Sequence, residues 1–98
     1  MRLLENKVAL ITGASRGIGA AIALAMAEQG ALVAATATTA AGAENISQRL
    51  QAHGLKGKGF VLNLSDDASI KSLFAELQDF GLPNILVNNA GITRDNLL

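Results

Sequence analysis

The chain has 98 residues, 50% of them hydrophobic, and its eight basic and eight acidic residues leave no net formal charge at pH 7. The basic residues are spread along the chain, so no stripe of charge suggests nucleic acid or a membrane surface as a partner. With no cysteine and one histidine, neither a disulfide framework nor a metal site is expected. Since no signal peptide and no run of about 18 apolar residues is present, we expect a soluble cytoplasmic protein.

Short apolar runs alternate with helical patterns along the chain. The runs at 8–11, 31–35, 60–64 and 85–87 are continuously apolar, which is typical of strands buried on both faces of a parallel sheet. The Ala/Thr-rich stretch 35–43 is predicted to be a loop. The alternating order predicts one α/β domain with right-handed crossovers and a doubly wound sheet of order 3-2-1-4. The first two helices would cover one face and the third helix the other.

Each helix is predicted from apolar residues that recur at helical spacing. The faces are formed by Ile18, Ile22 and Met26 in the first helix, by Ala43, Ile46 and Leu50 in the second, and by Ile70, Leu73, Phe74 and Leu77 in the third. Gly30 would end the first helix. The third helix would start at a cap supplied by Ser65 or Asp66 and end at Gly81, before Pro83.

The segment TGASRGIG, residues 12–19, follows the first predicted strand directly and opens the first helix. Gly13 can adopt the positive φ that a sharp turn needs, and Gly17 and Gly19 remove side chains where a ligand or the sheet must approach the backbone. The free N–H groups of the first helical turn, with the helix dipole, favour a phosphate there. The spacing G-x-x-x-G-x-G matches neither the commoner G-x-G-x-x-G pattern nor a P-loop. A tight turn that holds no ligand is the alternative.

A second motif, NNAG at 88–91, follows the fourth predicted strand. TGASRGIG and NNAG together resemble the short-chain dehydrogenase/reductase family, and the resemblance runs over the whole chain. It implies a Rossmann-like fold, with residues 1–98 as the N-terminal part of a single NADP-binding domain. The stretch NNAGITRDNLL (88–98) resembles more narrowly the members that reduce 3-oxoacyl groups in bacterial fatty-acid synthesis. This implies a substrate linked to acyl carrier protein and a homo-oligomer, a tetramer, for the full-length enzyme.

The residues after the second strand bear on the choice of cofactor. In many NAD-binding folds an acid about 20 residues beyond the glycines binds the ribose 2′-OH, but no Asp or Glu occurs from Gly30 to Ala43. Its absence leaves room for the 2′-phosphate of NADPH, which the guanidinium of Arg16 can bind through two parallel hydrogen bonds. The resemblance supports NADPH, with Ser15, Arg16 and Thr38 around the 2′-phosphate. A solvated Arg16 without a ligand is the alternative.

The remaining cofactor contacts rest on the resemblance. It implies that Asn63 and Leu64, at the end of the third strand, flank the adenine, where the family more often has Asp-Val; Asn63 could instead form a strand-end turn. One amide of the Asn88-Asn89 pair would tie neighbouring strands together. The predicted cofactor contacts are Gly13, Ala14, Ser15, Arg16, Ile18, Gly19, Thr38, Asn63, Leu64, Asn89, Ala90 and Gly91.

The chain contains no tyrosine. A tyrosine hydroxyl beside a lysine suits the protonation of an alkoxide, and the family uses a Ser, a Tyr, a Lys and an Asn that match no residue here. No catalytic residue is therefore named, and the 98 residues alone are expected to be inactive. Two other hypotheses remain open: a non-catalytic nucleotide-binding or interaction module, and a short-chain reductase acting on another carbonyl substrate. A bare apolar sheet face and edge also predict that the isolated chain is marginally stable or self-associates.

Overall fold

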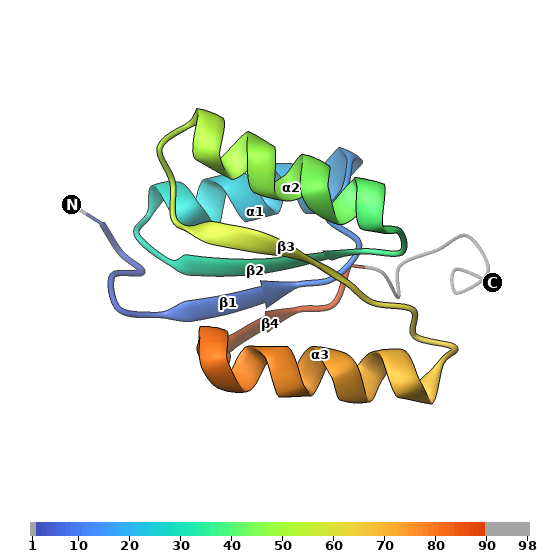
Figure 1. Cartoon of the computed structure of the whole chain (residues 1–98). Coiled ribbons are helices and arrows are strands. Elements are labelled where there is room, and N and C mark those ends of the chain that lie inside the picture. Colours follow the sequence, from blue (N-terminus) through green and yellow to red (C-terminus); the bar gives the residue numbers. More distant parts are fainter. Residues whose placement is uncertain (1, 90–98) are drawn as a thin grey trace, which may run out of the picture.

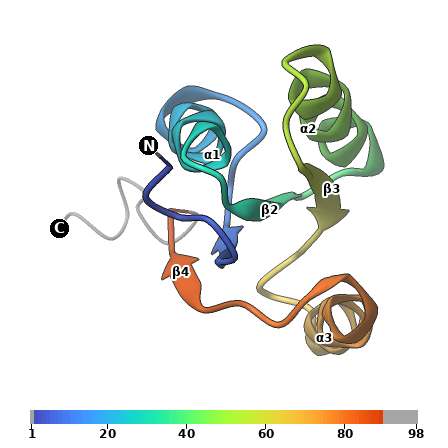
Figure 2. The ribbon, with the colours of Figure 1, turned by 90° about the vertical axis from the view of Figure 1, so that its left-hand side faces the viewer.

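The computed structural model describes residues 2–89, which form four strands and three helices in alternating order (Figure 1). The elements are β1 (Val8–Ile11), α1 (Gly17–Glu28), β2 (Leu32–Ala37), α2 (Ala40–Ala52), β3 (Gly57–Val61), α3 (Asp67–Phe80) and β4 (Ile85–Val87). The strand order is β3-β2-β1-β4 and every pairing is parallel. Helices α1 and α2 lie on one face of the sheet and α3 lies on the other (Figures 1 and 2). The predicted α/β class, strand order and placement of the helices are confirmed.

The core beneath α1 and α2 is built largely from alanine. The residues that α1 buries are Gly19, Ala20, Ala23 and Ala27. The predicted face of α1 is confirmed in part: Ile22 and Met26 are half-buried and pack against this core, but Ile18 is 74% exposed. Small side chains let the helix backbone lie close to the sheet, and the larger side chains of Ile22, Leu24 and Met26 pack against the same core while staying half-buried. The face predicted for α2 is confirmed, since Ala43, Ile46 and Leu50 are all buried.

The second core lies between α3 and the opposite face of the sheet. Leu73 and Leu77 are buried there with Phe60, and Phe80 packs edge-to-face on Phe60 with ring centroids 5.1 Å apart. The prediction that Phe74 belongs to the buried face is wrong, because Phe74 is 59% exposed. The residues that α3 turns inward lie on a narrower stripe than the sequence pattern suggests.

The ends of α3 follow from local chemistry. Asp66 is the N-cap and accepts a hydrogen bond of 3.0 Å from the Ala68 N–H, so Asp66 rather than Ser65 supplies the predicted cap. Gly81, at φ 144°, takes the C-cap position, where the helix was predicted to stop.

An apolar groove runs along the face that α3 only partly covers. We define it by Leu10, Leu62, Leu64, Ile70, Leu73, Phe74 and Leu86. In Figure 2, α3 lies below the β3 side of the sheet, and none of the described helices lies below β4. Leu86 of β4 is 64% exposed. The bare apolar surface expected at this end of the sheet is thus present in residues 2–89.

The edge strand β3 differs from its predicted bounds. β3 starts at Gly57 rather than residue 60 and ends at Val61 rather than residue 64. Its glycines allow α2 to pack against it, since a Cβ on Gly59 would collide with the Ala43 carbonyl and one on Gly57 would come within 2.8 Å of the Leu50 Cδ1. The glycine-rich segment around Gly57 and Gly59, which the sequence pattern places in a loop, is therefore part of a strand covered by α2.

The stretch 35–43 is not a loop. β2 continues to Ala37, which pairs with Val61, and α2 begins at Ala40. Thr39 is the N-cap of α2 and accepts a 3.0 Å hydrogen bond from the Gly42 N–H. Only Thr38 and Thr39 separate the two elements.

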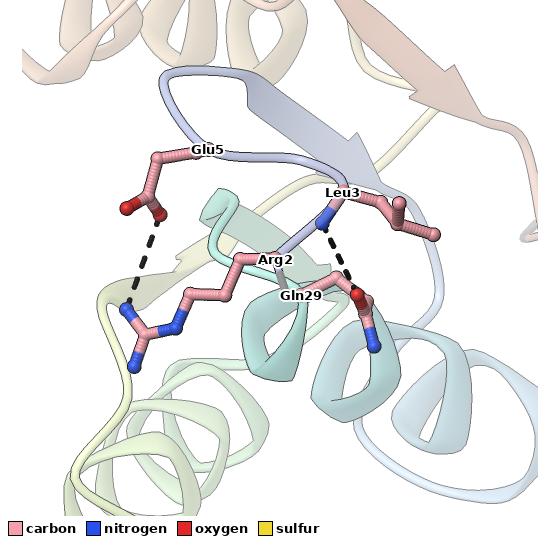
Figure 3. Close-up of polar contacts among 4 residues, drawn as sticks. All are labelled: Arg2, Leu3, Glu5 and Gln29. Atoms are coloured by element: carbon pink, nitrogen blue, oxygen red, sulfur yellow. Dashed lines mark hydrogen bonds and ion pairs between the residues drawn. The ribbon is translucent and has the colours of Figure 1, made fainter.

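The N-terminal segment is tied to the end of α1, at the edge of the sheet where the strands begin (Figure 3). The Leu3 N–H donates to Gln29 Oε1 over 3.2 Å, and Arg2 forms an exposed ion pair with Glu5 at 3.9 Å. Within residues 2–89, no helix combines the length and apolar character needed to cross a membrane.

Candidate functional site

The TGASRGIG segment forms the loop that follows β1 and the first residues of α1, which begins at Gly17. Gly13 and Gly17 have φ angles of 65° and 67°, a region that residues with a side chain rarely adopt. A Cβ on Gly17 would meet no atom of residues 2–89 within 4 Å, so this part of the chain leaves space beside the start of α1. The sharp turn predicted at Gly13 is present.

The end of β2 holds the first half of this loop. The Gly13 N–H donates to Thr36 Oγ1 over 3.2 Å, and the Ala14 N–H donates to the Thr36 carbonyl over 2.7 Å. Thr36 is 2% exposed and Ala14 is 1% exposed. Neither the methyl group nor the N–H of Ala14 is therefore available to a ligand.

The end of β4 holds the loop from the other side. Thr12 donates its hydroxyl to Asn88 Oδ1 over 3.2 Å, and Asn89 Nδ2 donates to the Gly13 carbonyl over 2.9 Å. A Cβ on Gly19 would collide with that carbonyl and lie 2.6 Å from Asn89 Nδ2, so Gly19 makes room for a contact within the protein. Both amides thus tie β4 to the loop. A contact between Asn89 and the cofactor ribose stays a prediction, and Ala90 and Gly91 lie outside the described residues.

The start of α1 is left open to an anion. Arg16 is the N-cap, but its side chain makes no capping hydrogen bond, and the first turn contains no acid. By contrast, Thr39 and Asp66 cap the other two helices. The N–H groups of the first turn of α1 can therefore bind a negatively charged group. Arg16 is exposed, and its side chain forms no hydrogen bond or ion pair with any residue from 2 to 89, so its guanidinium can reach a ligand.

Other predicted contacts surround this opening. Ile18 places an apolar side chain in solvent beside the first turn of α1, and Thr38 is exposed directly after β2. Ser15 is half-buried in the loop itself. The surface offers backbone donors, a cation, hydroxyls and an apolar side chain, which together suit a nucleotide. In the described part of the chain, no group of three or more His, Asp or Glu residues could hold a metal ion.

Asn63 and Leu64 do not close β3 as predicted, because the strand ends at Val61. The Asn63 Oδ1 accepts hydrogen bonds from the Ser65 N–H (3.1 Å) and the Ser65 hydroxyl (2.7 Å), which is a turn contact. Leu64 is 53% exposed in the apolar groove. Contacts of these two residues with adenine stay predictions.

Two residues at the loop are missing from the predicted site. Thr36 is a buried polar residue inside an apolar strand, and that exception in the pattern is the signal that could have found it. Arg49 of α2 donates from Nη2 to the Ser15 carbonyl over 3.3 Å. No local pattern shows this contact, because it depends on α2 packing beside a loop 34 positions earlier.

The parallel sheet of order 3-2-1-4, with helices on both faces, defines a Rossmann-like α/β protein, and comparison with known families agrees. The profile of the short chain dehydrogenase family matches residues 7–98. The chain belongs to this family.

Curated relatives of high similarity are 3-oxoacyl-[acyl-carrier-protein] reductases named FabG. The chain is 56% identical over 96 residues to that of Pseudomonas aeruginosa, which covers 97% of this chain and 39% of the relative. It is 57% identical over 95 residues to that of Escherichia coli, covering 96% of this chain and 38% of the relative. The chain thus spans about two-fifths of the length of the relatives that it matches.

Proposed function

We propose that this chain binds NADPH through the loop between β1 and α1 and forms the N-terminal part of a single Rossmann-type NADP-binding domain. The observation that carries the proposal is the start of α1, which has no side-chain cap among residues 2–89, beside an Arg16 guanidinium that pairs with none of those residues. A dinucleotide pyrophosphate fits the N–H groups of that turn. Gly17 leaves the approach open.

The preference for NADPH over NADH follows from the charges around the end of β2. No acid lies between Gly30 and Ala43 to bind a ribose 2′-OH or repel a 2′-phosphate. Arg16 and Thr38 are exposed and can bind the phosphate, with Ser15 beside them. A charge-assisted hydrogen bond of about 1.5–3 kcal/mol gives a preference of roughly ten- to a hundredfold.

The reaction we propose is the reduction of a 3-oxoacyl thioester carried on acyl carrier protein, by a homo-oligomeric enzyme of fatty-acid biosynthesis. The names of the relatives from Pseudomonas aeruginosa and Escherichia coli support this substrate. Bound NADPH would supply the hydride. The residues of this chain hold and orient the nucleotide, but with no tyrosine they offer no phenolic hydroxyl to protonate the product alkoxide. We therefore expect no turnover from the 98 residues alone, and weak cofactor binding at most.

The test is to compare the binding of NADPH and NADH by the wild-type chain and by Arg16→Ala, followed by nuclear magnetic resonance titration. Arg16→Ala should weaken NADPH binding by roughly ten- to a hundredfold and change NADH binding much less, because only NADPH carries the 2′-phosphate. Arg2→Ala removes the same charge at the end of the sheet where the strands begin. It should change the affinity for neither NADPH nor NADH. Equal losses for both cofactors in Arg16→Ala would contradict the assignment.

A further inference from the structure

A second arginine reaches the glycine loop from α2. Arg49 lies in the last turn of α2, and its Nη2 donates to the Ser15 carbonyl over 3.3 Å. Side chains on a helix tilt toward its N-terminus, so the guanidinium is carried back along α2 toward the loop. Gly42, two turns earlier on the same face, also lies beside Ser15: a Cβ there would be 3.5 Å from the Ser15 Cβ. This face of α2 is in direct contact with the loop.

The contact acts on the peptide that leads into Arg16. The Ser15 carbonyl and the Arg16 N–H belong to one planar trans peptide, so they point in opposite directions. Holding the carbonyl toward α2 holds the Arg16 N–H away from α2. It also restrains the extended backbone of Arg16, at φ −161° and ψ 173°. Because the Arg16 side chain contacts no polar partner among residues 2–89, its direction depends on this backbone.

Arg49 is half-buried, and the hydrogen bond to Ser15 is the one polar contact that its guanidinium makes with the described residues. A guanidinium stays protonated in proteins and accepts no hydrogen bond. Its charge in the last turn of α2 also interacts favourably with the helix dipole, which is a role in stability alone. A role in holding the Ser15 carbonyl and a role in stabilising α2 predict different effects on nucleotide binding.

We propose that Arg49 is a positioning residue that sets the preference of the loop for a nucleotide with a 2′-phosphate, by fixing the Ser15–Arg16 peptide so that Arg16 is presented to that phosphate. The inference rests on the proposed function, since it assigns a partner to the same site. A residue that only stabilises α2 would weaken the binding of every nucleotide alike.

The experiment replaces Arg49 with Met, which keeps an unbranched apolar stem and removes both the charge and the donors. Affinities for adenosine 2′,5′-bisphosphate and adenosine 5′-monophosphate are measured by nuclear magnetic resonance titration of the chain. The ratio of the two affinities should fall about fivefold in Arg49→Met, as expected for the loss of one hydrogen bond. The Arg16 amide resonance of the nucleotide-free chain should also move.

Two further variants sharpen the comparison. Arg2→Met removes the same side chain from an exposed ion pair at the far edge of the sheet, and should leave both the ratio and the Arg16 resonance unchanged. Arg49→Lys keeps a charged donor on a long stem and should retain most of the preference. If Arg49→Met does not fold, Arg49→Gln, whose amide is too short to reach the Ser15 carbonyl, gives the same comparison.

The outcomes separate this inference from the proposed function. An unchanged ratio, an unmoved Arg16 resonance, or equal weakening of both nucleotides in the Arg49 variants overturns the positioning role while the wild-type preference stands. A wild-type chain that binds the two nucleotides equally overturns the proposed NADPH site, and the inference with it.

Discussion

Gly17 and Gly19 stand two positions apart in the loop and are needed for different reasons. Gly17 is held at φ 67° with open space where a Cβ would be. Gly19 has no such backbone requirement, but a Cβ on it would collide with the Gly13 carbonyl and crowd the Asn89 amide. Gly17 is therefore needed for its backbone conformation, and Gly19 is needed because a larger side chain would not fit.

Gly19→Ala should therefore destabilise the chain by about 1–3 kcal/mol, the usual cost of forcing an extra carbon into a filled space. The free energy of unfolding is measured by urea denaturation, with circular dichroism as the signal. The side-chain amide resonances of Asn89 should shift at the same time, because its 2.9 Å hydrogen bond to Gly13 must move.

Gly17→Ala is the matched control. It should cost about 1–2 kcal/mol through backbone strain at positive φ, yet leave the Asn89 amide resonances in place, since nothing lies near the added methyl. A Gly19→Ala chain with wild-type Asn89 resonances would show that Gly19 does not serve this contact.

How far the site could be predicted also depends on single residues. Arg16 and the glycines were found because their chemistry is local to one segment. Arg49 was missed because its contact with Ser15 joins an exposed-looking helix position to a distant loop. The sequence alone offers the turn at Asn63 only as an alternative, since the Ser65 contacts that favour it arise only when the strand ends early.

At the scale of the elements, the order of strands and helices followed from apolar periodicity and the handedness of crossovers. The bounds of β3 did not, because Gly57 and Gly59 signal a turn unless α2 is known to lie against them. The sequence pattern predicts the buried face of α1 only in part, for a related reason. Alanine contributes little to an apolar pattern, yet Ala20, Ala23 and Ala27 are among the residues that α1 buries.

The start of α2 offers a test at this scale. Thr39→Ala removes the side-chain oxygen that accepts from the Gly42 N–H at 3.0 Å, and should lower the free energy of unfolding by about 0.5–2 kcal/mol. Thermal or urea denaturation measures the change. Thr38→Ala alters the same residue type one position earlier, where no cap is lost, and should cost much less. A comparable loss in both variants would mean that the cap does not stabilise α2.

For the whole molecule, the apolar groove brings several exposed apolar side chains of the described residues together. Leu64, Phe74 and Leu86 are 53%, 59% and 64% exposed on one side of the sheet. Contiguous apolar surface of this kind favours association with other surfaces. We therefore expect the isolated chain to self-associate as its concentration rises, as sedimentation velocity would show.

Replacing Phe74 and Leu86 together with Lys should reduce this association, because two like charges in the groove repel a second copy. Leu3→Lys is the control, since Leu3 is 72% exposed but lies outside the groove. A wild-type chain that stays monomeric over the same concentrations would contradict the expectation.

The contacts that hold the glycine loop also determine when, during folding, the loop reaches its final structure. Thr12 and Gly13 are bound by Asn88 and Asn89, each pair being 76 positions apart, and Ser15 by Arg49, 34 positions later. Contacts of such long sequence separation form slowly, because the intervening chain must be ordered first. During synthesis the loop therefore emerges early but gains its full set of contacts only after β4 has joined the sheet. The proposed nucleotide binding should accordingly report completion of the last described strand, even though the glycine loop itself lies in the first fifth of the chain.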